Sequence, residues 1–378
     1  MLPNLNKGKE LNSQSLKYRF IFACGGTGGH LFPAIAVADC IKKKIPDAEI
    51  LFVGTKKKLE STYVPKSGYS FKSIWISGFS RKLSLKNILI PLKVIFSILQ
   101  SLLISLRFKP SVAIGTGAYV AGPMIWSAYM FGSKIILLEA NSYPGLTNRL
   151  LQRKADEIHV TFEDSKKYFT KSEKVYLSGN PIRFSGTIID KPSAVQKLGL
   201  NASLFTILII GGSLGAKAIN EAVAKNLDRI LQLRVQLIWQ TGKNYYELYK
   251  NYQTSRIKVL PFIDDMATAY SAADLLIARA GASTVTEAAF WGKAVIFIPS
   301  DNVTDDHQYK NAKTLLDNNA AELIRDSEAV SMLYYKILEL MNNKEQLNSF
   351  AINIKKFSKP NAAEVIADSA IRLAEGRV

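Results

Sequence analysis

The feature that most constrains this chain is a glycine-rich turn that follows a buried apolar run and occurs twice. The apolar run at 18–24 leads into GGTGGH at 25–30, and the run at 204–210 leads into GGSLG at 211–215. A helical pattern follows each turn, starting near Pro33 after the first one, and another apolar run follows this first helix at 50–54. Strand, turn, helix and strand is the rhythm of a parallel α/β sheet. The sequence therefore predicts two similar α/β domains.

The two turns lie about half of the 378-residue chain apart, which predicts how the chain is divided. Glycine, proline and serine residues between the two halves mark the expected linker. The predicted parts are a flexible leader at 1–17, an N-terminal domain at 18–180, a linker region at 181–203, a C-terminal domain at 204–355, and a C-terminal helix at 356–378 that packs back on the N-terminal domain.

Positive charge is concentrated in the first half of the chain. Residues 1–180 hold 26 Lys and Arg against 11 Asp and Glu, whereas residues 181–378 hold 23 against 20. This distribution predicts an anionic partner, either a nucleic acid, an acidic membrane or a phosphorylated substrate, although solubility alone is another interpretation. No RNA-binding motif, zinc spacing or aromatic–basic interleaving accompanies the charge, so we expect no nucleic acid.

Residues 88–106 are apolar enough to be considered as a membrane span. They include 13 large apolar side chains, and 19 residues could cross a bilayer. Pro91, Lys93 and Gln100 interrupt the segment, and a single span would separate the two glycine turns. We predict instead one or two amphipathic helices, which form either a core element or a face that dips into a membrane surface. The basic residues expected around this face are Arg81, Lys82, Lys86, Lys93, Arg107 and Lys109.

Glycine turns between a strand and a helix direct backbone N–H groups toward anions, above all phosphates. A third such turn, GTGAYVAGP at 115–123, strengthens this interpretation. The first turn does not match the dinucleotide fingerprint, which needs glycine at Leu31, and no P-loop pattern is present. GGSLG also matches the nucleophile elbow of serine hydrolases, with Asp264 and His307 following in order. That alternative leaves the first turn and the basic half without a role.

A few residues are candidates for acid–base or binding chemistry. His30 ends the first turn, where it can either accept a proton from a hydroxyl or hold the loop by hydrogen bonds. His159, in an apolar strand, is predicted to be structural. Glu287 lies near the start of a helix expected to open at 281–284, where it can bind ribose hydroxyls or cap the helix. The acidic pairs at 264–265 and 305–306 have no supporting metal ligands nearby, so we predict no metal site.

Seven segments of the chain together resemble the MurG family, the bacterial N-acetylglucosaminyltransferases that make lipid II. In the family's order they are GGTGGH at 25–30, PGLTNR at 144–149, GNPIR at 179–183, GGS at 211–213, FIDDM at 262–266, and the segments 279–287 and 305–312. The chain departs from the family at Leu138 and Ala140, where His and Gln are common, and at Ala118, where Gly is usual.

The resemblance implies a GT-B fold of class α/β, in which two Rossmann-like doubly wound domains face each other across a cleft. It implies inverting transfer of GlcNAc from UDP-GlcNAc to the C4 hydroxyl of MurNAc in undecaprenyl-diphosphate-MurNAc-pentapeptide. We expect no cofactor and no metal. The expected partners are UDP-GlcNAc, the lipid-linked acceptor and an anionic membrane surface, and the expected location is peripheral, on the cytoplasmic face of the bacterial plasma membrane.

The resemblance also implies roles for particular residues. His30 is the expected base of a direct displacement, which needs no paired carboxylates. Ile263 would lie against uracil, Glu287 would hold ribose, and Ser213 with Arg183 would hold phosphate. An inactive sugar-nucleotide-binding module is the remaining alternative. The residues expected to bind UDP-GlcNAc are Thr27, Gly28, Gly29, Asn141, Arg183, Ser213, Ile263, Ala282, Ser283, Thr284, Val285, Thr286, Glu287, His307 and Gln308.

Overall fold

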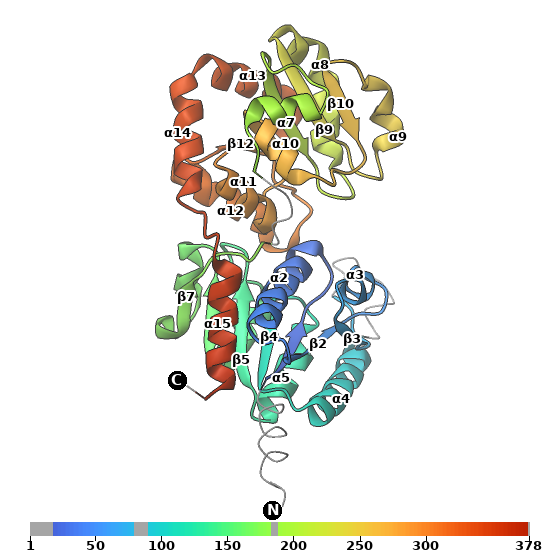
Figure 1. Cartoon of the computed structure of the whole chain (residues 1–378), viewed down its shortest axis with the longest axis vertical. Coiled ribbons are helices and arrows are strands. Elements are labelled where there is room, and N and C mark those ends of the chain that lie inside the picture. Colours follow the sequence, from blue (N-terminus) through green and yellow to red (C-terminus); the bar gives the residue numbers. More distant parts are fainter. Residues whose placement is uncertain (1–17, 79–89, 183–187, 377–378) are drawn as a thin grey trace, which may run out of the picture. The chain divides into compact units, whose positions relative to one another are not determined.

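The computed structural model describes residues 18–78, 90–182 and 188–376, which form two compact units (Figure 1). Unit 1 comprises Met1–Arg183 and Lys359–Val378, and unit 2 comprises Phe184–Ser358. The predicted leader, residues 1–17, lies outside the described residues, as does Arg183. The chain thus passes from unit 1 to unit 2 and returns to unit 1 at its C-terminal end.

Unit 1 is built on a seven-stranded parallel sheet in the order β3-β2-β1-β4-β5-β6-β7. Its strands are β1 (Arg19–Ala23), β2 (Glu49–Gly54), β3 (Ser70–Ser73), β4 (Val112–Gly115), β5 (Lys134–Glu139), β6 (Glu157–Val160) and β7 (Val175–Leu177). Its helices are α2 (Gly28–Lys44), α3 (Glu60–Lys66), α4 (Ile90–Phe108), α5 (Ala121–Met130), α6 (Leu146–Leu151) and α15 (Ala362–Ala374), with short 3₁₀ turns at Gln152–Lys154, Glu163–Tyr168 and Ser172–Lys174.

Alternating residues of β1 explain why helices cover both faces of this sheet. Phe20 and Phe22 are fully buried in a cluster with α2 and α15, whereas Ile21 and Ala23 are buried in a second cluster with α4 and α5. A strand that is apolar at every position can be buried on both faces, as parallel sheets require. Helix α15 packs on α2, β4 and β5, so the C-terminal segment completes the core of the N-terminal sheet.

Unit 2 is built on a six-stranded parallel sheet in the order β10-β9-β8-β11-β12-β13. Its strands are β8 (Phe205–Ile210), β9 (Val235–Gln240), β10 (Ile257–Leu260), β11 (Leu275–Ala278), β12 (Ala294–Phe297) and β13 (Glu322–Leu323). Its helices are α7 (Lys191–Lys197), α8 (Lys217–Gln232), α9 (Tyr246–Tyr249), α10 (Met266–Ala272), α11 (Ala282–Trp291), α12 (His307–Asp317), α13 (Ala329–Asn342) and α14 (Lys344–Lys355), with 3₁₀ turns at Lys250–Tyr252, Thr304–Asp306 and Asp326–Glu328.

Residues 181–203 are not a continuous linker, in contrast to the sequence prediction. Asp190 caps α7 by accepting a hydrogen bond from the Ser193 N–H, and α7 packs on α10 of unit 2. Lys191 also pairs with Asp274, the residue before β11, at 2.6 Å. The composition of this stretch resembles a loop, but the cap and these contacts make its second half a part of unit 2.

Both sheets reverse their strand order beside the first strand of the unit. β1 pairs with β2 on one side and β4 on the other, and β8 pairs with β9 and β11 in the same way. At such a switch point two loops leave the carboxyl ends of neighbouring strands in opposite directions and open a crevice that binds ligands. The glycine turns at 25–29, 115–117 and 211–215 and the segment 279–281 all occupy these positions.

Helix α4 buries its serines and exposes its large apolar residues. Ser97, Ser101 and Ser105 are fully buried, and Ser105 accepts a hydrogen bond from the Ser127 hydroxyl of α5 at 2.9 Å. By length and composition Pro91–Phe108 could cross a membrane, although 22% of it is buried in unit 1. The helix connects β3 to β4 of one sheet and packs along α5. Its exposed apolar residues are Leu92, Val94, Ile95, Phe96, Leu99, Leu103 and Leu106.

Candidate functional site

The first glycine turn presents the start of α2 at the switch point of unit 1. Helix α2 begins at Gly28, not near Pro33 as the sequence pattern suggests, because the Thr27 carbonyl already accepts hydrogen bonds from the N–H groups of His30 and Leu31. The first N–H groups of a helix have no partner within it, so this turn can receive an anion. Thr27 is exposed and extended, and Gly28, Gly29 and His30 form the first helical turn.

His30 lies against the third glycine turn. A Cβ atom at Gly117 would stand 3.7 Å from His30 Cε1 and 3.2 Å from the Asn148 Nδ2 atom. Gly117 also has a positive φ of 87°, which favours glycine. The structure therefore brings the predicted base together with the loop after β4 and with α6, a set of contacts that the sequence alone did not reveal.

The carboxylate of Glu139 organises the loop that carries Asn141. It accepts hydrogen bonds from the Asn141 N–H at 3.0 Å, the Gly145 N–H at 2.9 Å and the Asn148 amide at 2.9 Å. Burial raises the pKa of Glu139, and these donors oppose that rise. The Asn141 side chain also donates to Glu139, at 3.3 Å. Leu138, one of the departures from the family pattern, is buried in the apolar cluster beneath.

In unit 2 two glycine turns interlock at the carboxyl ends of β8 and β9. A Cβ at Gly215 would stand 2.2 Å from the Thr241 carbonyl oxygen, and one at Gly242 would stand 2.1 Å from the Gly215 nitrogen. The Lys243 N–H donates to the Ser213 carbonyl at 3.2 Å. Ser213 is exposed, just ahead of α8. The second turn therefore fixes the backbone of the first, which leaves the Ser213 side chain at the surface.

Gln240, at the end of β9, connects two loops that the sequence analysis treats separately. Its amide donates to the Gly212 carbonyl at 3.0 Å, and its side-chain oxygen accepts from the Ile263 N–H at 3.0 Å. Ile263 is buried and its neighbour Phe262 is exposed. The sequence analysis missed Gln240, and the available signal was a polar residue at the carboxyl end of a mostly apolar strand.

Glu287 lies in the second turn of α11, which opens at Ala282 as the sequence predicts. Its carboxylate accepts a hydrogen bond from the Tyr270 hydroxyl at 3.0 Å. Burial raises the pKa of Glu287 to about 7, and the Tyr270 hydrogen bond opposes that rise. Gly281 is the N-cap of the helix, and within the described residues Glu287 bonds to Tyr270 rather than capping the helix at Gly281. The carboxylate is therefore poised to change its charge near neutral pH.

The loop after β12 joins the same end of the unit 2 sheet. His307 and Gln308 begin α12, and the Gln308 side-chain oxygen accepts from the Ser300 N–H at 3.0 Å. The Asn311 amide donates to the Ala280 carbonyl at 3.1 Å, and Arg279 donates to the Ile298 carbonyl at 2.8 Å. These bonds tie the start of α12 to the segment ahead of α11, so the two predicted donor segments form one cluster.

Members of both acidic pairs have structural roles. Asp265 caps α10 by accepting from the Thr268 N–H at 3.0 Å, and it pairs with Lys197 at 2.7 Å. Asp305 and Asp306 have positive φ values and form the turn before α12. Within 18–78, 90–182 and 188–376, no group of three or more His, Cys, Asp or Glu residues could hold a metal ion.

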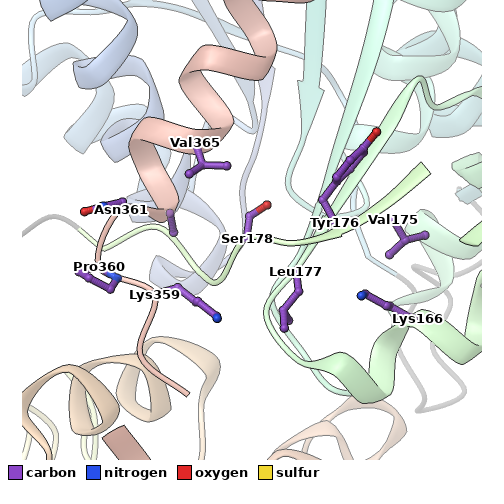
Figure 2. A pocket seen from close by; sticks show the side chains of 10 residues that line it. Lys166, Val175, Tyr176, Leu177, Ser178, Lys359, Pro360, Asn361 and Val365 are labelled. Atoms are coloured by element: carbon purple, nitrogen blue, oxygen red, sulfur yellow. The ribbon is translucent and has the colours of Figure 1, made fainter. Parts of the chain in front are cut away.

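A separate depression of about 500 Å³ lies within unit 1, at the start of α15 (Figure 2). None of the predicted site residues lines it, and Lys166 on its wall already pairs with Glu163 at 2.8 Å. It is therefore distinct from the switch-point loops. Its lining residues are Lys166, Val175, Tyr176, Leu177, Ser178, Lys359, Pro360, Asn361, Ala362 and Val365.

Known families and proteins match both units of the chain. Residues 20–160 match the glycosyltransferase family 28 N-terminal domain, and residues 206–366 match the glycosyltransferase family 28 C-terminal domain. A protein of Flavobacterium psychrophilum named UDP-N-acetylglucosamine--N-acetylmuramyl-(pentapeptide) pyrophosphoryl-undecaprenol N-acetylglucosamine transferase is 43% identical over 96% of this chain and 99% of its own length. A Cytophaga hutchinsonii protein of the same name is 41% identical over 94% of this chain and 97% of its own length.

Solved structures agree with these matches. The crystal structure of Acinetobacter baumannii MurG is 31% identical and has a TM-score of 0.74, with 93% of this chain and 98% of that chain covered. S. aureus MnaA with UDP has a TM-score of 0.68 at 15% identity, covering 95% of this chain and 97% of that one, which shows likeness of fold alone. Two parallel-sheet units with these relatives make the fold GT-B. The chain belongs to the MurG family, within glycosyltransferase family 28.

Proposed function

We propose that this chain transfers GlcNAc from UDP-GlcNAc to the C4 hydroxyl of MurNAc in undecaprenyl-diphosphate-MurNAc-pentapeptide, with inversion at the anomeric carbon. The observation that carries the proposal is a glycine turn at the switch point of each sheet in a member of the MurG family. Each turn supplies a phosphate-binding crevice. Two such crevices suit a reaction in which donor and acceptor both carry a diphosphate.

The donor binds to unit 2 in this proposal. Ser213 and the start of α8, with Arg183, contact the diphosphate, Ile263 lies against uracil, and Glu287 accepts hydrogen bonds from the ribose hydroxyls. The backbone of residues 282–286 wraps around the nucleotide. His307 and Gln308 contact the sugar hydroxyls. Because the Gln308 oxygen is occupied by the Ser300 N–H, its amide N–H₂ is the group that donates to the sugar.

The reaction is a direct displacement. The acceptor O4 forms a bond to C1 of GlcNAc while the bond from C1 to the phosphate oxygen of UDP breaks, and His30 takes the proton of the attacking hydroxyl. Thr27, Gly28, Gly29 and Asn141 approach the sugar and the acceptor diphosphate from unit 1. Backbone N–H groups and the N-terminus of α8 stabilise the charge that develops on departing UDP. No metal or cofactor takes part in these steps.

Acceptor-dependent release of UDP tests the proposed function. Purified protein is incubated with UDP-GlcNAc, with and without a lipid-linked MurNAc acceptor, and UDP release and the disaccharide product are measured. We expect both only when the acceptor is present. Equal UDP release in the two samples would contradict transfer. UDP binding without any release would favour the sugar-nucleotide-binding module instead.

UDP binding is expected to strengthen as pH rises from 6 to 8. Burial raises the pKa of Glu287 to about 7, and a carboxylate that accepts from ribose must be ionised, so binding releases a proton below this pKa. The Kd for UDP should therefore fall about 10-fold over this range. Titration calorimetry in buffers of different ionisation enthalpy measures both the Kd and the proton release.

Glu287→Gln is the control for this pH dependence, because the phosphate of UDP titrates in the same range. The variant keeps the size of the side chain and cannot ionise. It should bind UDP more weakly than the wild type at pH 8, and the difference between the two proteins should shrink at pH 6. A wild-type profile that runs parallel to the variant's at every pH would contradict a role of the Glu287 charge in binding.

The exposed apolar face of α4 is the proposed membrane contact. The face is continued by Trp75, which is 47% exposed and stands 5.8 Å from the Phe96 ring, and Lys93 lies over the Trp75 ring. Of the predicted basic rim, Arg107 and Lys109 are exposed on α4 and just after it, while Arg81, Lys82 and Lys86 lie outside the described residues. Apolar and basic groups together favour an anionic lipid surface. The chain would thus act peripherally, on the cytoplasmic face where UDP-GlcNAc is available.

The double variant Leu99→Glu/Leu103→Glu is expected to bind anionic vesicles at least about 10-fold more weakly, because burial of one leucine contributes about 1.5–3 kcal/mol. Both side chains are about half exposed, so the fold should tolerate the change. Sedimentation with phosphatidylglycerol vesicles measures the binding. Leu248→Glu, at an exposed position of α9 in unit 2, is the matched control and should sediment like the wild type. Equal binding of all three proteins would exclude this face.

A further inference from the structure

A fully buried carboxylate lies beneath the first glycine turn, and no step of the proposed reaction uses it. Glu60 is the first residue of α3 and is 0% exposed. Its Oε1 atom accepts hydrogen bonds from the Thr55 N–H at 2.9 Å and the Thr55 hydroxyl at 2.7 Å. Its Oε2 atom accepts from the Gly26 N–H at 3.2 Å. The carboxylate therefore connects the loop after β2 to the loop after β1.

Two glycines make room for this side chain. A Cβ at Gly25 would stand 2.6 Å from Glu60 Oε1, and a Cβ at Gly54 would stand 2.5 Å from Glu60 Cγ. Both distances are too short for any side chain. Gly25 is thus a glycine because a carboxylate lies against it from the inside, whereas Gly28 and Gly29 begin the helix at the binding face. The glycine turn therefore contacts Glu60 on its inner side, in addition to the ligand proposed to bind on its outer side.

Burying a carboxylate costs several kcal/mol unless its oxygens are satisfied. The recorded partners of Glu60 among the described residues are N–H and O–H donors, not cations. A carboxylate can accept at both of its oxygens, as these three donors require, whereas an amide of the same size has only one acceptor atom. The acidic side chain therefore suits a link that joins the loop after β2 to the Gly26 N–H.

We propose that Glu60 is a positioning residue of the transfer reaction, which holds the Gly26 N–H inward and so fixes the outward direction of the Thr27, Gly28 and Gly29 N–H groups and of His30. The inference rests on the proposed function and deepens it. Because Gly26 has a positive φ of 86°, the turn reverses direction at this residue, and the bond to Glu60 holds it at the reversal. The ligand then meets donors that are already oriented, which reduces the cost of reorganisation on binding.

Glu60→Gln tests the proposal, because the amide keeps the volume and can still accept from Thr55 through its oxygen. Its N–H₂ group then faces the Gly26 N–H, and because both groups are donors the hydrogen bond to Gly26 is lost. We expect kcat/KM for the lipid-linked acceptor to fall about 10- to 100-fold, as for other small misplacements of reacting groups. The Kd for UDP should not change, since the UDP-binding residues that are described lie in unit 2. Hydrogen exchange of the Gly26 to Leu31 amides should become faster.

Glu157→Gln is the matched control. Glu157 is a buried carboxylate of the same unit, paired with His159 and Arg372 and distant in sequence from the glycine turn. This variant should lose thermal stability but keep the kinetic constants and the loop exchange of the wild type. Glu60→Gln with unchanged loop exchange overturns the proposal, as does a fall in activity that only follows the loss of folded protein. If the wild type itself transfers no sugar, the proposed function fails, and loop exchange still decides whether Glu60 holds the turn.

Discussion

Replacing His30 with alanine is expected to lower kcat by about 10²- to 10⁴-fold, the usual contribution of a positioned general base. His30 lies in the first turn of α2, against Gly117, where a hydroxyl that approaches the glycine turn would meet its ring. The Kd for UDP should stay the same, because the described residues proposed to bind UDP belong to unit 2. Turnover is measured at saturating UDP-GlcNAc and acceptor, so that the change reports on the chemical step rather than on binding.

His159→Ala serves as the control for loss of a histidine from the same unit. His159 is buried between the Ser178 hydroxyl at 2.6 Å and the Glu157 carboxylate at 3.1 Å, as expected of a structural histidine. Its replacement should reduce thermal stability and leave the kcat of the folded protein unchanged. If His30→Ala retains near-normal turnover, His30 is not the base and only holds the loop.

Gly215→Ala should strongly destabilise unit 2. The new methyl group would stand 2.2 Å from the Thr241 carbonyl oxygen and 2.7 Å from the Tyr245 ring, at a φ of 91° that side chains rarely adopt. Backbone strain and overpacking together should lower the free energy of unfolding by about 2–5 kcal/mol. Because the loop must move away from Gly242, UDP affinity should fall as well. Thermal unfolding followed by circular dichroism, together with UDP calorimetry, measures both effects.

Gly199→Ala separates the two causes of that loss. Gly199 also belongs to unit 2 and has a φ of 67°, but nothing lies within 4 Å of the position of its Cβ. Its replacement should cost only the backbone strain, about 1–2 kcal/mol, and leave UDP affinity intact. Equal destabilisation by the two substitutions would mean that the contact between the turns at Gly215 and Gly242 contributes nothing to the free energy of unfolding.

The repeated strand, turn and helix could be predicted because its signals are local. Apolar runs ended by glycine identify parallel strands, and the spacing of the two runs predicts two units. The predicted start of α2, near Pro33, was wrong for an equally local reason. Glycines disfavour helices and proline favours a first turn, so the pattern points to Pro33, whereas the structure begins the helix at Gly28.

The residues that organise the loops could not be predicted, because their partners are distant in the sequence. Glu60 bonds to Gly26, and Gln240 bonds to Gly212, across 34 and 28 residues. The spacing of apolar residues does not reveal such pairs: Glu60 alone suggests an ordinary surface residue, and the place of Gln240 at the end of a strand does not identify its partners. The sequence could not predict which face of α4 is buried, for a related reason. The helix carries one stripe of large apolar residues and one of serines, and it is the contact with α5 that buries the serines.

The return of the chain to unit 1 sets the order in which the protein can mature during translation. Ile366, Ala367, Ala370 and Leu373 of α15 fill the core around α2, so the first sheet stays open on one side until these residues leave the ribosome. Unit 2, synthesised in between, holds all of its own strands and can fold earlier. The domain that begins first is therefore finished last, and its incomplete apolar face is what a chaperone would need to shield.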